Sequence, residues 1–359
     1  MPYFAVHPYN SINMGTISTR LAAAADRYGL FSRALSVRRA GWGQRGLLVV
    51  LYHRVAALSE IGDLDPDLVD ATPDEFDQQM GYLREHFHPV SLEDVLDAHR
   101  ASRDLPPGSV LVTFDDGYLD NFQNALPALK KHDMKALFFV STGHLSERRL
   151  FWWERLALLV GRSKRAHAHI EYPVPEDFVF GSAGEKLRVI RRLNRIVKDH
   201  YGLDLERFYQ QISTAFDVSW SAEEEFALAD SILMSWDQVR QLRAAGMGIG
   251  SHTRAHRVLQ TLKPDELLDE LVASRAKLEI EVGHPVTSIA YPVGKSIAEI
   301  KPIRRALEQA GYELGFTTQP GLNRFAGTVD RFDLKRLPID RGIPTGLKRA
   351  WMTFPFLAP

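Results

Sequence analysis

Short apolar runs of strand length, separated by helix-like segments, constrain the fold of this chain most strongly. The runs Leu47–His53, Val110–Phe114 and Ala136–Val140 are nearly continuously apolar, which is typical of strands buried on both faces. Between the first two, Thr72-Pro73-Asp74-Glu75 has the residues of a helix cap, and apolar residues follow at helical spacing. Repeated strand–helix units predict a parallel sheet, closed or nearly closed into a barrel.

The alternation pauses in the middle of the chain. The segment from about Leu145 to Ile232 is more charged and mostly helical in period, so it predicts an insertion. Strands and helices resume at Ser235, with strands expected at 247–250, 288–291 and 312–317 and helices at 236–245, 264–282 and 300–310. The expected divisions are an N-terminal helical extension (1–46), two barrel parts (47–144 and 235–340), the insertion between them (145–234) and a tail (341–359).

Composition excludes several kinds of site. The formal net charge is -1, and no basic stripe favours nucleic acid. The chain has no cysteine, which excludes disulfides, thiolate metal sites and a thiol nucleophile. A metal would therefore need His, Asp or Glu ligands.

The N-terminal region predicts an amphipathic helix rather than a membrane span or a signal peptide. No apolar run reaches the roughly 18 residues of a spanning helix. Charged residues interrupt the stretch Ile17–Leu35, which has Leu21, Ala24, Tyr28, Phe31 and Leu35 near one face. This helix either packs on the barrel or lies on a membrane surface. We expect a cytoplasmic location, either free or peripheral at the membrane.

Two adjacent carboxylates, Asp115 and Asp116, follow the apolar run that ends at Phe114. Neighbouring carboxylates repel each other unless a cation compensates their charge. With a divalent metal, one would bind the ion and the other would take a proton from a water. The alternative is a strand-to-helix turn in which an Asp caps the next helix.

Two histidines, His252 and His256, follow the predicted strand that ends at Gly250. Residues four apart share one face of a helical turn, which is good spacing for metal ligands. The alternative is a pair of solvated histidines, since the chain contains 13. Because parallel strands of a barrel end on one rim, Asp116 and the two histidines together predict a metal site with positions open for water and substrate.

A third motif, Tyr291-Pro292-Val293-Gly294, also follows a predicted strand. A backbone N–H near Val293 could stabilise an oxyanion, and Tyr291 would lie beside the substrate. The alternative is an ordinary turn containing Pro and Gly.

Thr-Phe-Asp-Asp-Gly at 113–117, Ser-His-Thr-x-x-His at 251–256 and Tyr-Pro-x-Gly at 291–294 resemble the polysaccharide deacetylase family, the NodB-like carbohydrate esterases of family 4. The resemblance implies a distorted (β/α) barrel, here with a mostly helical insertion, that removes N-acetyl groups from amino sugars. It implies Asp115 as the base, and Asp116, His252 and His256 as ligands of a divalent metal, commonly zinc. The Tyr-His pair ending at His53 is similar to the exopolysaccharide branch of the family.

The chain departs from the family pattern at two places. Ala290 stands where the family has an Arg that orients the base, so this role is empty or belongs to another cation such as Lys295 or Arg336. The family's C-terminal histidine, which serves as the general acid, has no counterpart, because no histidine follows His284.

His53 is the predicted general acid, since it ends the first barrel strand on the same rim. His144, after the strand that ends at Val140, is the rival. The alternative for His53 is a core histidine with all its hydrogen bonds satisfied.

The insertion carries two further patterns. Phe151-Trp152-Trp153 either stacks on sugar rings or anchors the insertion to the barrel. A basic helix face is either solvated or contacts an anionic polymer or lipid phosphate; it consists of Arg188, Arg191, Arg192 and Arg195.

Three functions are compatible with these residues. The first is deacetylation of an N-acetylated sugar in a polysaccharide or a lipid-linked glycan precursor. The second is hydrolysis of a small amide, as in a deformylase, at the same site. The third is a metal- or sugar-binding module without turnover.

Overall fold

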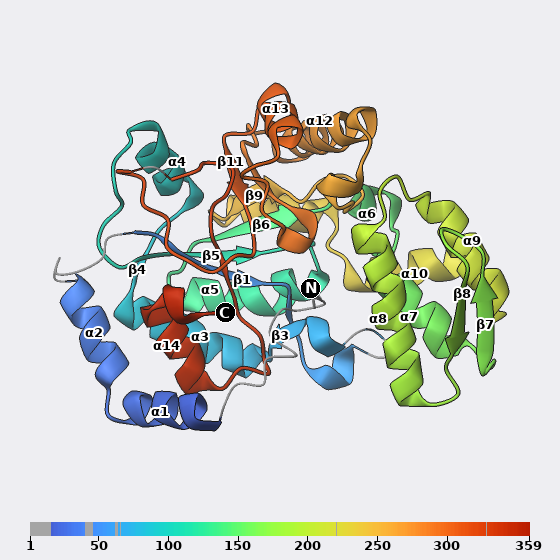
Figure 1. Cartoon of the computed structure of the whole chain (residues 1–359). Coiled ribbons are helices and arrows are strands. Elements are labelled where there is room, and N and C mark those ends of the chain that lie inside the picture. The colour runs from blue at the N-terminus through green and yellow to red at the C-terminus, as the bar shows by residue number, and fades with distance from the viewer. Residues whose placement is uncertain (1–15, 40–45, 62–63, 65, 220, 328) are drawn as a thin grey trace.

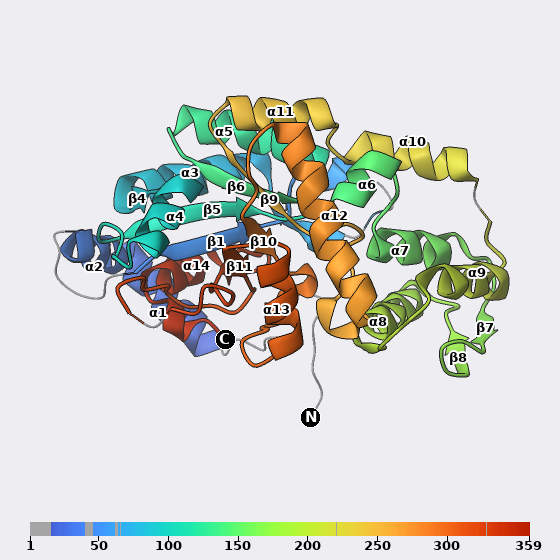
Figure 2. The same cartoon turned by 90° about the horizontal axis from the view of Figure 1, so that it is seen from above.

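The computed structural model describes residues 16–39, 46–61, 64, 66–219, 221–327 and 329–359 (Figure 1). A curved sheet lies at its centre, with helices outside it (Figure 2). The strand order is β11-β10-β9-β6-β5-β1-β12, and β4 pairs with β5 off this path. The strands are β1 (Leu48–Tyr52), β4 (His88–Pro89), β5 (Ser109–Phe114), β6 (Ala136–Val140), β9 (Gly248–Ser251), β10 (Ser288–Ala290), β11 (Leu314–Phe316) and β12 (Leu337–Pro338).

Every pairing in this sheet is parallel, as the strand–helix alternation predicts. The two ends of the strand order approach each other, because a parallel bridge joins Phe316 of β11 to Leu334, just before β12. The strand residues are buried on both faces. The fold is therefore the predicted distorted, nearly closed (β/α) barrel.

Helices cover the outside of the sheet, and several begin where their caps predict. Thr72 and Ser235 both form capping boxes. The covering helices are α3 (Pro73–His86), α4 (Leu92–Arg100), α5 (Leu126–Lys131), α11 (Trp236–Ala244), α12 (Pro264–Val282) and α13 (Lys301–Gln309). After Asp116, a turn and a π-helical segment, Asn121–Ala125, precede α5. There the side chain of Asp120 accepts from the N–H of Val55, and that of Asn121 donates to the carbonyl of His53.

The insertion lies beside the barrel and has its own apolar cluster (Figure 1). It is mostly helical, as predicted, but it also contains an antiparallel hairpin of β7 (His167–Ile170) and β8 (Glu176–Val179) that the periodicity did not reveal. The hairpin strands are only four residues long, too short for a clear alternation. The helices here are α6 (Thr142–Glu147), α7 (Trp152–Arg162), α8 (Ala183–Asp199), α9 (Leu205–Phe216) and α10 (Ala222–Ile232).

The N-terminal helix prediction was wrong in one respect: two helices form, α1 (Thr16–Arg27) and α2 (Leu30–Arg39), with Gly29 at φ 66° between them. The break moves Leu21 and Tyr28 to the surface, while Phe31 and Leu35 are buried. Both helices pack on α14 (Thr345–Thr353) of the tail, which supports packing on the barrel. Residues 1–15 and 40–45 of the predicted extension lie outside the described residues. Among the described residues, no helix combines the length and hydropathy that a membrane span requires.

Short elements complete the chain. A small parallel pair joins β2 (Arg54–Val55) to β3 (Val69–Ala71) at the rim of the barrel. The 3-10 turns are Leu58–Glu60, Pro66–Leu68, Leu259–Thr261, Pro292–Gly294 and Pro355–Leu357.

Candidate active site

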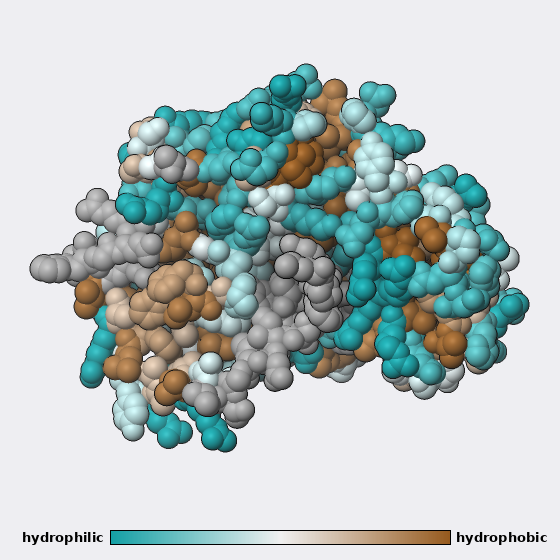
Figure 3. All heavy atoms as spheres, viewed as in Figure 1, coloured by the Kyte–Doolittle hydropathy of each residue, from teal (hydrophilic) through white to brown (hydrophobic). Residues whose placement is uncertain are grey.

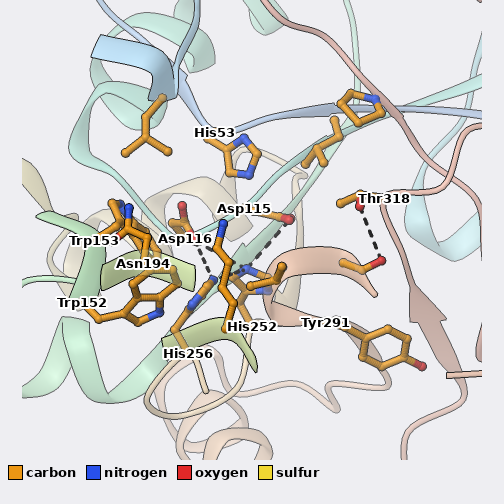
Figure 4. A pocket seen from close by; sticks show the side chains of 16 residues that line it. His53, Asp115, Asp116, Trp152, Trp153, Asn194, His252, His256, Tyr291 and Thr318 are labelled. Atoms are coloured by element: carbon orange, nitrogen blue, oxygen red, sulfur yellow. Dashed lines mark hydrogen bonds and ion pairs between the residues drawn. The ribbon is translucent and has the colours of Figure 1, made fainter. Parts of the chain in front are cut away.

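One pocket gathers the predicted site residues at the carboxyl ends of the strands (Figure 4). The barrel and the insertion both contribute to its lining. The lining residues are Leu51, His53, Leu68, Asp115, Asp116, Trp152, Trp153, Asn194, Lys198, His252, His256, Tyr291, Val293, Gly294, Thr318 and Pro338.

Asp116, His252 and His256 bring three ligand atoms together in the pocket. The Nε2 atoms of the two histidines are 3.1 Å apart, and Asp116 Oδ1 lies 3.4 Å from each. All three residues are buried, and Asp116 Oδ1 has no hydrogen-bond partner among the described residues. Buried oxygens are rarely left unpaired. Three converging ligand atoms, one of them an unpaired buried oxygen, therefore fit a divalent cation.

The contacts of His252 and the burial of His256 both suit a role as metal ligand. His252 Nδ1 lies 2.9 Å from the carbonyl oxygen of Ala290, so this nitrogen donates its proton there and leaves Nε2 as the ligand atom. Burial, followed by the charge of His252, holds the pKa of His256 well below its usual value. A neutral imidazole is the form that binds a metal.

Rare backbone conformations cluster around this site. Asp116, Thr253, His256 and Val293 all have positive φ angles, of 76°, 63°, 50° and 64°. Such conformations cost on the order of 1–3 kcal/mol for a residue with a side chain, and they concentrate at functional sites. Along a regular strand, Asp115 and Asp116 would point to opposite faces. The turn at Asp116 lets both carboxylates line one pocket.

Asp115 is held by Arg336, which is distant in the sequence and directly precedes β12. The guanidinium of Arg336 donates to both carboxylate oxygens, at 2.7 and 2.8 Å, and is itself fully buried. Burial alone would raise the pKa of Asp115, but the charge of Arg336 and then that of His252 lower it below its usual value. Lys295 instead pairs with Asp199 on the surface. Of the two cations considered for the role left open at Ala290, Arg336 is the one in place.

His53 lies on the same rim and is bound by Asp70, a residue that the sequence reasoning missed. Asp70 Oδ2 accepts the backbone N–H of His53 at 2.5 Å and lies 3.1 Å from its Nδ1. Burial lowers the pKa of His53, but the hydrogen bond and charge of Asp70, with smaller contributions from Asp116 and Asp115, raise it to about 9. The ring is therefore protonated at neutral pH, as a general acid must be.

His144, the rival acid, does not line the pocket. Its Nδ1 bonds the carbonyl of Arg149, and its ring lies against Phe151 with centroids 4.2 Å apart. Burial lowers the pKa of His144, which favours the form without a proton to give. The geometry thus favours His53.

The third motif also reaches the pocket. Tyr291 lines the pocket, and its hydroxyl donates to the carbonyl of Phe332, which fixes the side chain in the barrel. Val293 lines the pocket in its left-handed conformation. That its N–H binds an oxyanion stays a prediction.

The insertion supplies the other wall of the pocket. Trp152 and Trp153 come from α7, and the ring of Trp153 meets that of His256 edge-on at 4.6 Å. Both also belong to the apolar cluster of the insertion, and Trp153 Nε1 donates to the hydroxyl of Tyr118 in the barrel part of the chain. Asn194 and Lys198 come from α8, one helical turn apart, and the sequence reasoning missed both. Only their i, i+4 spacing could have indicated a shared face.

The predicted basic face of α8 points away from the pocket. Arg188, Arg191, Arg192 and Arg195 are all exposed, and the surface over α8 is hydrophilic (Figure 3). Arg192 pairs with Glu176 of the hairpin, and Arg188 lies 3.7 Å from Glu185. This supports a solvated face.

Comparisons with known proteins place these motifs in a family. A family model described as polysaccharide deacetylase matches residues 102–169 and 203–315. The chain is 24% identical over 212 residues to the putative polysaccharide deacetylase YxkH of Bacillus subtilis, an alignment covering 59% of this chain and 45% of that one. It is 29% identical over 98 residues to the poly-beta-1,6-N-acetyl-D-glucosamine N-deacetylase of Escherichia coli, covering 27% of this chain and 14% of the relative.

The chain thus aligns with less than half the length of these curated relatives. Among solved structures, the deacetylase PplD of Streptococcus pyogenes, in complex with acetate, has a TM-score of 0.54 at 21% identity. That comparison covers 85% of this chain and 97% of PplD, and it supports the fold. The family match leaves out His53, Arg336 and all of α8, so these parts of the site rest on the geometry alone.

Proposed function

Because the chain belongs to the polysaccharide deacetylase family, we propose that it is a metal-dependent hydrolase that removes N-acetyl groups from amino sugars of a polysaccharide or glycan precursor. One observation carries this proposal. The ligand atoms of Asp116, His252 and His256, among them the unpaired Oδ1 of Asp116, converge beside Asp115, a carboxylate that Arg336 keeps ionised.

The proposed metal is zinc, since two imidazoles and one carboxylate form a common catalytic zinc site with open positions. A cation held by Asp116, His252 and His256 would supply Lewis-acid chemistry, polarising the amide carbonyl and acidifying a water. The same donor set also binds other divalent metals.

The protein's own groups divide the proton transfers between them. Asp115 accepts the proton of the attacking water, because its lowered pKa keeps it ionised at neutral pH. Arg336 positions the carboxylate through two parallel hydrogen bonds. His53, protonated beside Asp70, donates a proton to the departing amine. The N–H of Val293 is proposed to bind the oxyanion.

A binding module without turnover is less compatible with this geometry. Two departures from the family pattern favoured that alternative: Ala290 in place of the arginine that orients the base, and the absence of the C-terminal histidine that serves as the general acid. Arg336 reaches both oxygens of Asp115 from another strand end, and His53 lines the same pocket. A cation that orients the base and a histidine that can act as the general acid are thus both present at the pocket.

Acetate release tests the proposal directly. Zinc-loaded protein would be incubated with β-1,6-linked and β-1,4-linked N-acetylglucosamine oligomers, with a lipid-linked N-acetylated precursor and with a small formamide. Acetate from a glycan substrate that stops on chelation and resumes with zinc supports it. Formate release without acetate would indicate the small-amide alternative. Metal binding without either product would indicate a binding module.

A further inference from the structure

The insertion wall of the pocket contains polar atoms without partners. Asn194 Oδ1 and Trp152 Nε1 are both buried, since Asn194 is only 2% exposed and Trp152 only 3%. Neither atom bonds another described residue. Both residues line the pocket that contains Asp115 and the metal-ligand atoms. In Figure 4 they lie on one side of His256, across from Tyr291 and Thr318.

Unpaired atoms of this kind are costly. Leaving a buried donor or acceptor without a partner costs about 1–3 kcal/mol. The neighbouring Trp153 avoids that cost, because its Nε1 donates to the hydroxyl of Tyr118, which in turn donates to Glu154. Two adjacent exceptions on a pocket wall therefore indicate atoms that a ligand pairs.

The two atoms specify the chemistry of that ligand. Asn194 Oδ1 accepts a hydrogen bond and the indole N–H of Trp152 donates one. A sugar hydroxyl can do both, and a pyranose presents several hydroxyls beside an apolar ring face. The subsite adjoins the reacting groups, since the ring centroids of Trp152 and His256 are 6.4 Å apart.

The helix that carries Asn194 lies outside the matched family pattern. The family match skips residues 170–202, which include most of the hairpin and all of α8. Part of the pocket wall is thus built by a segment outside the matched family pattern, as a specificity element would be.

We propose that Asn194 and Trp152 form a sugar subsite that binds hydroxyl groups of the same amino sugar whose acetamido group lies at Asp115. The subsite selects a hydroxyl-bearing sugar over a small amide, and this assignment rests on the proposed deacetylase function.

The test uses Asn194→Leu, which keeps the branched side-chain shape but removes the polar atoms, and Trp152→Phe, which keeps a ring but removes the N–H. Both are made in full-length Asp115→Asn protein, so that the substrate is not consumed. Binding of a β-1,6-linked N-acetylglucosamine tetramer is measured by calorimetry. Each variant should weaken binding about tenfold. Arg195→Ala, an exposed change on the same helix, is the matched control and should have no effect on binding.

Thermal unfolding distinguishes a ligand-binding role from a structural one. Replacing an unpaired buried amide by Leu should leave the melting temperature unchanged or raise it. In protein that retains Asp115, Asn194→Leu should raise KM for the tetramer more than it lowers kcat.

Equal tetramer binding by Asn194→Leu and Arg195→Ala would overturn the proposal. So would the absence of detectable tetramer binding to the Asp115→Asn protein. A large fall in melting temperature that accounts for weaker binding would also overturn it. If binding depends on Asn194 but protein with Asp115 releases no acetate, the sugar subsite stands and the deacetylase function fails.

Discussion

The two walls of the pocket differ in how their buried polar groups are paired. On the barrel wall, Asp116 Oδ1 is unpaired and available to a metal, but the other reacting groups are paired: Asp115 bonds Arg336, His252 bonds the carbonyl of Ala290, and His53 bonds Asp70. On the insertion wall, Asn194 Oδ1 and Trp152 Nε1 have no partner among the described residues. Paired groups are fixed in one orientation, which suits proton transfer, whereas unpaired groups keep their bonding capacity for a ligand.

The largest effects are expected from the barrel wall's reacting groups. Asp115→Asn should retain stoichiometric zinc but lower kcat for acetate release about 100- to 10,000-fold, because the base is lost and the ligands remain. His252→Ala should lose both zinc and turnover, because one of the three ligand residues is gone. Elemental analysis and an acetate assay measure the two properties. Full activity of Asp115→Asn would rule out Asp115 as the base.

Breaking the pairing on the barrel wall should destabilise the protein. Arg336→Met leaves the Asp115 carboxylate buried without its partner, which typically costs about 3–5 kcal/mol. Urea unfolding of the metal-free protein measures this loss. Arg331→Met, which removes a partly exposed pair with Glu308, is the control and should cost less than about 1 kcal/mol. Equal losses in the two variants would contradict the special role of Arg336.

The Asp70–His53 pair should make stability depend on pH in metal-free protein. The folded-state pKa of His53, about 9, lies above its ordinary value of 6.5. The pair's contribution is therefore complete below about pH 6.5 and is lost as the pH rises to about 9. The difference in free energy of unfolding between wild type and Asp70→Asn should shrink by about 1–3 kcal/mol over that range. A difference that is constant with pH would show that His53 is not charged there.

The smallest effect on stability and turnover is expected from removing Lys295, which joins the two walls at the surface. Lys295, in the loop after β10, donates to the carbonyl of Lys198 and pairs with Asp199 at the end of α8. Both side chains of the ion pair are substantially exposed, so Lys295→Ala should change stability by less than about 1 kcal/mol. Its kcat should remain close to that of wild type. A loss comparable to that of Arg336→Met would show that the walls depend on this link.

Local pattern was sufficient for part of the site. Asp115, Asp116 and His252 directly follow buried strands, and parallel strands of a barrel end on one rim. The sequence therefore predicted that these residues lie close together. It failed where local signals were ambiguous, as at Gly29, which divides the expected N-terminal helix, and at the short hairpin of the insertion.

The sequence by itself thus determined the parallel barrel and the residues of its metal-ligand cluster, because apolar periodicity and strand ends are encoded within a few adjacent positions. The tertiary structure alone decided that Arg336, 221 residues from Asp115, orients that carboxylate, and that Asp70 binds His53. It also decided that Asn194 lies on the pocket wall with an unpaired oxygen. Pairing between buried polar groups depends on which distant segments pack together, and no spacing along one segment reports it.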